Sequence, residues 1–108
     1  MILEHAILNV KEGEASRFEA AVKEALPLIA ATKGFIDLEV RPCLKKAGRY
    51  LLLVRWETLE AHVEGFRGSD RYQEWRRLLH HFYEPFPLVE HYGEPAVEIR
   101  GRSGTVNQ

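Results

Sequence analysis

The chain has 108 residues, the length of one domain. Hydrophobic residues make up 45% of it and charged residues 29%, which is the composition of an ordinary soluble globular domain. The formal net charge of −1 argues against a nucleic-acid partner and against an anionic membrane partner. No apolar run approaches the roughly 20 residues that span a bilayer. The single cysteine, Cys43, excludes an internal disulfide framework and predicts a cytoplasmic location.

The first half of the chain predicts a strand, a helix and a second strand. Residues 2–10 carry apolar side chains on both faces, as a central strand does. From about residue 14 to 33 the apolar period becomes helical, with one buried stripe made of Phe18, Val22, Ala25 and Ile29. Residues 35–43 alternate as an edge strand that Pro42 ends. On this strand Phe35 is expected to point away from the face that holds Ile36, Leu38 and Val40.

The second half predicts a nearly all-apolar strand over residues 49–56, then two helices. Thr58 can cap the first of these helices. The second helix starts near Ser69 and carries an aromatic stripe. Residues 88–92 predict a fourth strand, and residues 96–99 a short further strand.

This order of elements, β-α-β-β-α-β with a split second helical region, predicts a ferredoxin-like α+β fold. Right-handed crossovers place the first and third strands at the centre of a four-stranded antiparallel sheet, with every helix on one face. The predicted domain spans residues 1–100, and residues 101–108 are expected to form a flexible tail.

The face of the sheet without helices is expected to be apolar, because Leu51 and Leu53 lie on it. Such a patch is larger than a soluble monomer usually exposes. A second copy of the chain would cover it with two-fold symmetry, and burying several hundred Å² would contribute on the order of 10 kcal/mol gross. We therefore predict a homodimer that forms through the open sheet face.

The segment WETLEAHVEGFRGSDRYQEW, residues 56–75, resembles the antibiotic biosynthesis monooxygenase family. The resemblance lies in a strand that ends in Trp-Glu, a short helix with Ala-His near its middle, and a Ser-containing turn before an aromatic-rich helix. The segments Lys11-Glu12-Gly13 and Lys33-Gly34-Phe35 are similar to the same pattern, and the likeness covers roughly residues 1 to 92. It implies a dimeric α/β barrel with a pocket between the sheet and the two later helices.

Some members of this family oxygenate aromatic polyketides or quinols with dioxygen and without a metal or flavin, and others degrade heme. Trp56 and His62 match the family's strand-end tryptophan and helix histidine. The heme-degrading branch uses an asparagine, a tryptophan and a histidine at positions that correspond here to Ala6, Phe66 and Arg76. These three departures argue against heme degradation.

Two histidines are candidate catalytic residues. His62 falls on the apolar side of its helix, where a neutral imidazole could take a proton from a substrate; the alternative is a core histidine bonded to a backbone carbonyl. His5 lies on a central strand, so the strand register decides between the pocket and the dimer interface.

Aromatic side chains are the candidate substrate-binding residues, since their rings could stack on an aromatic ligand; packing in the core is the alternative for each. They are Trp56, Phe66, Tyr72, Trp75 and Tyr50. No metal site is predicted, because the adjacent pair His80 and His81 diverges by about 100° on a helix.

The sequence thus favours cofactor-independent oxygenation of a small aromatic or quinol. The alternative is a non-enzymatic dimeric α/β-barrel module that binds a hydrophobic small molecule, with heme degradation as a third reading.

Overall fold

A computed structural model describes residues 1–101 of the chain; the remainder of the predicted tail at 101–108 lies outside the described residues. Four strands form one antiparallel sheet in the order β2-β3-β1-β4. The elements in chain order are β1 (Ile2–Asn9), α1 (Ala15–Ala30), β2 (Phe35–Pro42), β3 (Arg49–Trp56), η1 (Ala61–Phe66), α2 (Asp70–Leu79), η2 (His80–Phe82) and β4 (Val89–Tyr92). The predicted ferredoxin-like α+β fold is confirmed, and the sheet is open rather than closed.

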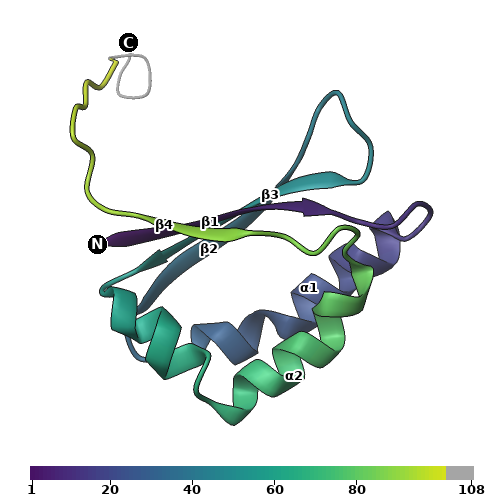
Figure 1. Cartoon of the computed structure of the whole chain (residues 1–108), viewed down its shortest axis with the longest axis horizontal. Helices are drawn as coiled ribbons and strands as arrows, with labels where there is room; N and C mark the ends of the chain where they lie inside the picture. Colours follow the sequence, from purple (N-terminus) through teal and green to yellow (C-terminus); the bar gives the residue numbers. More distant parts are fainter. Residues whose placement is uncertain (102–108) are drawn as a thin grey trace.

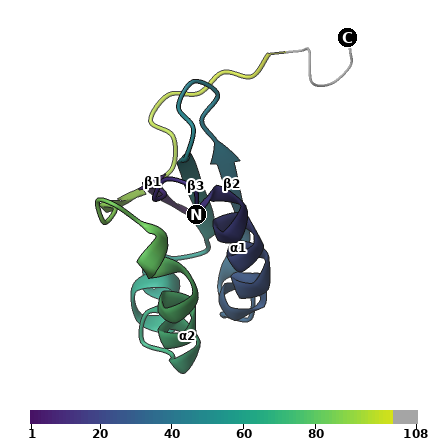
Figure 2. The same ribbon diagram turned by 90° about the vertical axis from the view of Figure 1, so that its right-hand side faces the viewer.

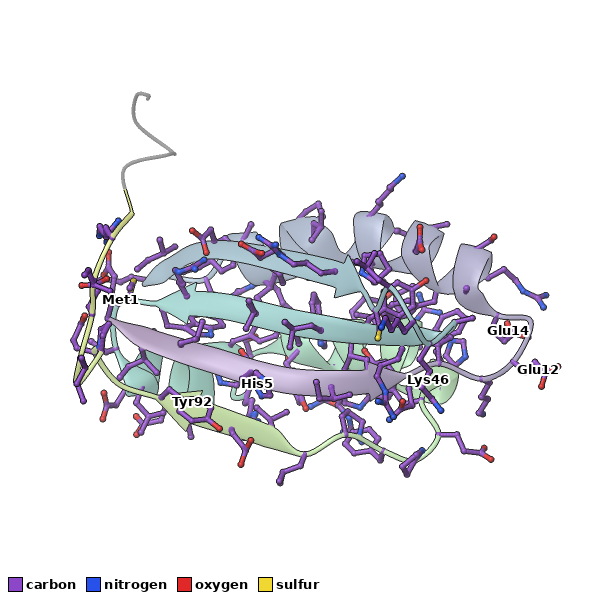
Figure 3. All side chains as sticks on the ribbon, turned by 90° about the horizontal axis from the view of Figure 1, so that it is seen from above. Met1, His5, Glu12, Glu14, Lys46 and Tyr92 are labelled. Atoms are coloured by element: carbon purple, nitrogen blue, oxygen red, sulfur yellow. The ribbon has the colours of Figure 1, made fainter. Side chains whose placement is uncertain are left out.

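All helices cover one face of the sheet, and α1 and α2 lie side by side beneath it (Figures 1 and 2). The core lies between this face and the helices. Its strand residues alternate as predicted, with Ala6 and Leu8 of β1 and Leu52 and Val54 of β3 all buried. The other face of the sheet is bare, and Figure 3 looks onto it.

One prediction for β2 is wrong, because the strand contains a β-bulge. Phe35 pairs with Trp56, and Asp37 pairs with Arg55, the neighbour of Trp56 on β3. Ile36 is therefore left without a partner on β3. The extra residue reverses the alternation before it. Phe35 therefore packs edge-on against Trp56 on the helix side, and Ile36 is 43% exposed.

The short strand predicted at residues 96–99 is not formed. The chain leaves the sheet after β4, and Figure 1 shows residues beyond it running away from the body of the fold. Val97 and Ile99 are almost fully exposed. Apolar alternation alone cannot make a strand where no neighbouring strand is available to accept its hydrogen bonds.

The short helix η1 is a single π-helical turn held at both ends. Its first N–H, from Ala61, donates to Oγ1 of Thr58 at 3.1 Å, which confirms the predicted cap. Its widened turn closes when the N–H of Arg67 donates to the carbonyl of His62 at 3.0 Å, an i to i+5 bond. Such turns are rare and frequently mark functional positions. Here the turn carries His62 to the sheet.

Gly34 sets how closely η1 approaches the end of β2. It has a φ of +92°, and a Cβ there would lie 2.7 Å from Cβ of Ala61. Gly13 has a similar φ of +80°, but a Cβ there would meet nothing within 4 Å.

We expect Gly13→Ala to lower the free energy of unfolding by about 1 kcal/mol, the cost of a left-handed alanine. Gly34→Ala adds a steric clash, so its loss is expected to reach roughly 2–4 kcal/mol. Urea unfolding of the two variants measures the difference. Equal losses would mean that the contact between Gly34 and Ala61 does not constrain the fold.

Candidate functional site

A cavity of about 90 Å³ lies between the helix face of the sheet and the elements η1, α2 and η2. Its walls are mainly aromatic and apolar, with a few polar groups. The lining residues are Glu4, Ala6, Leu8, Ile29, Leu52, His62, Phe66, Arg67, Tyr72, Trp75, His80, Tyr83, Phe86, Pro87 and Val89. A cavity of roughly 150 Å³ can hold benzene, so this one limits an occupant to about one ring and requires some movement of its walls.

A buried carboxylate forms the polar centre of the cavity. Glu4 points from β1 towards the helices and is 5% exposed. Its Oε1 accepts a hydrogen bond from Nε1 of Trp56 at 3.0 Å and lies 3.4 Å from Nε2 of His62. Nδ1 of His62 lies 2.8 Å from Nε2 of His91 on β4. Four side chains from β1, β3, η1 and β4 thus form one connected network.

The partners in this network determine where its protons lie. An ionised Glu4 can only accept, so a proton on Nε2 of His62 is the tautomer that suits the 3.4 Å contact between Nε2 and Oε1. Nδ1 of a neutral His62 is then bare and accepts from Nε2–H of His91. The imidazole of His62 also stacks on the indole of Trp56, with ring centroids 5.1 Å apart.

Burial drives both members of the central pair towards their neutral forms. Burial, the positive charge of Arg67 and the proximity of His91 together lower the pKa of His62 to about 3, and burial is the largest of these causes. Burial also raises the pKa of Glu4, opposed by the hydrogen bond from Trp56 and the charge of Arg67. His62 therefore remains uncharged at neutral pH. Glu4 is the better proton acceptor, because a raised carboxylate pKa approaches the working pH.

The other polar groups of the cavity are also held neutral, except Arg67. Burial and the charge of Glu4 raise the pKa of the Tyr83 hydroxyl, and Tyr72 adds to this effect. Burial lowers the pKa of His80, as does the charge of Arg76. A ligand in the cavity would meet neutral donors, one carboxylate and the guanidinium of Arg67.

The structure brings four of the predicted site residues together around this cavity: His62, Phe66, Tyr72 and Trp75. Trp56 is fully buried behind them and does not line the cavity. Its place is to donate a hydrogen bond to Glu4 and to support the ring of His62.

Two predicted site residues lie elsewhere. His5 is on the open face of the sheet, edge-on to Tyr92, and Figure 3 labels both. The register of β1 decides this, because Glu4 and Ala6 take the helix side. Tyr50 lines a separate cavity of about 210 Å³ beside α1, where its hydroxyl donates to Glu19 at 2.6 Å. Neither side chain lines the first cavity, and the roles in catalysis and substrate binding expected of His5 and Tyr50 stay predictions.

Three polar residues of the site, Glu4, Arg67 and His91, were not found from the sequence. Glu4 had one signal, a carboxylate on a strand face that is otherwise apolar. Arg67 and His91 had none, since both join the site only through the packing of η1 and β4 on β1.

Within residues 1–101, no three His, Cys, Asp or Glu side chains are placed to hold a metal ion. His80 lines the cavity and His81 is exposed. Of the positions compared with the heme-degrading branch, Ala6 and Phe66 line the cavity and Arg76 is exposed on α2. None of the helices in the described part of the chain is long and apolar enough to cross a bilayer.

The model of the family described as antibiotic biosynthesis monooxygenase matches residues 1–78. The chain therefore belongs to this family, as the resemblance predicted.

Three relatives illustrate how far the similarity extends. The "Uncharacterized protein YczJ" of Bacillus subtilis is 53% identical over 92 residues, which are 85% of this chain and 97% of that protein. A crystal structure from Bordetella bronchiseptica, described as "Putative antibiotic biosynthesis monooxygenase", is 34% identical with a TM-score of 0.82; the match covers 87% of this chain and 96% of the other. SnoaB of Streptomyces nogalater is 12% identical, with a TM-score of 0.76 and coverage of 89% and 94%, and it shares the fold.

The lowered pKa of His62 predicts a specific dependence of stability on pH. The unfolded imidazole gains a proton as pH falls below about 6.5, whereas the folded one does so only near 3. Stability is therefore full above 6.5 and is lost between these values. Relative to His62→Gln, the wild-type chain should lose at most about 1.4 kcal/mol per pH unit in this window.

Urea unfolding at several pH values between 4 and 8 measures this loss, and His81→Gln at an exposed position is the control. A constant difference between wild type and His62→Gln would contradict the burial of a neutral imidazole.

Proposed function

We propose that this chain is a cofactor-independent monooxygenase that acts on a small aromatic or quinol bound in the cavity. The observation that carries the proposal is the carboxylate of Glu4, buried in a cavity with aromatic walls, hydrogen-bonded to Trp56 and 3.4 Å from Nε2 of His62. Membership of the family supports the reaction class, and the description of SnoaB as a "cofactor-independent oxygenase" supports the absence of a cofactor requirement.

The reaction needs a base more than it needs any other group. Removing a proton from a quinol hydroxyl makes its ring electron-rich enough to give electrons to dioxygen. In the overall balance, a hydroquinone and O₂ give a hydroxyquinone and water. Glu4 accepts the hydroxyl proton and returns it when the bound oxygen leaves as water.

The remaining lining supports this step. The guanidinium of Arg67 stabilises the negative charge that moves from Glu4 to the substrate oxygen. The rings of Phe66, Tyr72 and Trp75 offer stacking surface and keep water from the intermediate.

Glu4→Gln keeps an acceptor for Trp56 but removes the base. We expect oxygen uptake with a panel of small hydroquinones to fall by about 10²–10⁴-fold in this variant, the usual contribution of a general base. Glu12→Gln, at an exposed position in the turn after β1, is the matched control and should keep wild-type rates.

Equal rates in wild type and Glu4→Gln would exclude Glu4 as the base. A wild-type chain that is stabilised thermally by these aromatics yet takes up no oxygen would favour the second candidate function, a binding module for hydrophobic small molecules. One observation favours this candidate: both nitrogens of His62 already have polar partners without a ligand, Nδ1 in a hydrogen bond to His91 and Nε2 in contact with Glu4.

We also propose that two copies pair through the open sheet face. Leu3 and Ile7 of β1 and Leu51 and Leu53 of β3 form an apolar stripe on this face, with His5 between the two residues of β1; Ile7 is 40% exposed. Arg55 flanks the stripe and pairs with Asp37 at 3.0 Å, so the rim is polar and the centre apolar. A second copy would hide this stripe.

Leu53→Glu is expected to give monomers, because it places a charge in the middle of the stripe. Leu44→Glu carries the same change at a fully exposed loop position and should leave the assembly unaltered. Light scattering coupled to gel filtration measures the molar mass of each variant in solution. A wild-type monomer, or a dimeric Leu53→Glu variant, would contradict pairing through this face.

Cys43 is exposed and has no disulfide partner. A reducing compartment suits a free thiol of this kind, so we keep the cytoplasm as the proposed location.

A further inference from the structure

His91 connects the buried site to the surface. It lies directly opposite Glu4 in the pairing of β4 with β1, and both side chains take the helix side of the sheet. His91 is half-buried, whereas Glu4 and His62 are almost fully buried. Nδ1 of His91 has no hydrogen-bond partner in the described part of the chain. Within residues 1–101 the only fully buried side-chain polar atom without a partner is Nδ1 of His5, so Nδ1 of His91 is open to solvent.

A line of one hydrogen bond and one close polar contact therefore runs from the half-buried His91 to the carboxylate. Its links are Nε2 of His91 to Nδ1 of His62, at 2.8 Å, and Nε2 of His62 to Oε1 of Glu4, at 3.4 Å. Each imidazole has one nitrogen towards the next group on this line and the other towards the previous one, which is the arrangement that can pass a proton along.

We propose that His91 and His62 form a proton path between water and Glu4, so that Glu4 exchanges protons with solvent while the cavity is occupied. This inference rests on the proposed function for the use of Glu4 as a base. The path itself is a property of the folded chain without substrate. His91 acts here as a positioning residue through His62 and does not touch the substrate.

The transfer balances without any co-reactant. A proton from water bonds to Nδ1 of His91, the Nε2 proton of His91 moves to Nδ1 of His62, and the Nε2 proton of His62 moves to Oε1 of Glu4. Two N–H bonds and one O–H bond form, and two N–H bonds and one bond in the donor water break. Both rings end neutral in the other tautomer, and the reverse sequence ionises Glu4 again.

The surroundings of His62 and His91 disfavour a positive charge on either ring, so a proton that enters the path is passed on rather than held. Burial and the charge of Arg67 lower the pKa of His91, and they lower that of His62 as well. The groups that face this path are Glu4 from β1, Arg67 beside η1, and Tyr72, His80 and Tyr83 from the far wall of the cavity; Glu90 and Tyr92 lie on the opposite face of the sheet. No group on the path holds a positive charge at rest.

The test is nuclear magnetic resonance of ¹⁵N-histidine in the full chain without substrate. We expect His62 to be neutral with its proton on Nε2 at pH 7. In His91→Gln, the glutamine amide can still donate to Nδ1 of His62 but cannot pass a proton on. Exchange of the His62 Nε2 proton with water should slow by on the order of tenfold or more, with the tautomer unchanged.

His81→Gln, at an exposed position on η2, is the matched control and should leave the exchange rate unaltered. His91→Met, which also cannot pass a proton on and in addition lacks the donor, should slow exchange in the same way if His91→Gln folds poorly. An unchanged or faster exchange rate in the folded His91 variant would overturn the path, since water would then reach Glu4 through the cavity. A doubly protonated His62 at pH 7 would overturn it as well.

Kinetics separate this inference from the proposed function. If the chain oxygenates a hydroquinone, His91→Gln should keep the ionisation of Glu4 in the pH profile of kcat/KM and lose it from that of kcat, because the occupied site can no longer exchange protons. Normal profiles of both parameters in His91→Gln would remove the path and leave the proposed oxygenase standing. No turnover by any variant would remove the oxygenase and leave the exchange measurement valid.

Discussion

The burial of one carboxylate on the core face of β1 is the constraint on which the site depends. Glu4 occupies a position where alternation calls for an apolar side chain, and it has almost no contact with water. A buried carboxylate is costly unless hydrogen bonds compensate for the lost solvation. Trp56 supplies such a bond, Nε2 of His62 lies 3.4 Å from the same oxygen, and Arg67 supplies a compensating charge. The cavity, the neutral state of His62 and the proposed chemistry all follow from this arrangement.

The scaffold explains how His62 reaches Glu4. The glycine at position 34 lets the chain after α1 come within contact distance of η1, and the cap from Thr58 starts the π-helical turn. The wider turn projects His62 onto the ring of Trp56, where stacking orients both imidazole nitrogens along the line between Glu4 and His91. Backbone geometry in a short segment thus decides which ring nitrogen faces the carboxylate.

The two faces of the sheet serve different purposes. Side chains on the helix face build the core and the cavity, whereas those on the open face form an apolar stripe with a charged rim. The period of two in β1 separates Glu4 from His5, so neighbours in the chain contribute to different surfaces. A register slip of one residue would exchange them and destroy both the core and the site.

The sequence by itself determined the order of elements, the ferredoxin-like topology, the central place of β1 and β3, and the aromatic character of the region around His62, because hydrophobic periodicity and crossover handedness are local or topological rules. Only the tertiary structure decided that Phe35 turns inward at a bulge, that His5 and Tyr50 leave the site, and that Glu4 enters it. The physical reason is that a side chain's partners depend on strand register and on segments distant in the chain. His91 meets His62 only because β4 pairs with β1 on the sheet that η1 packs against.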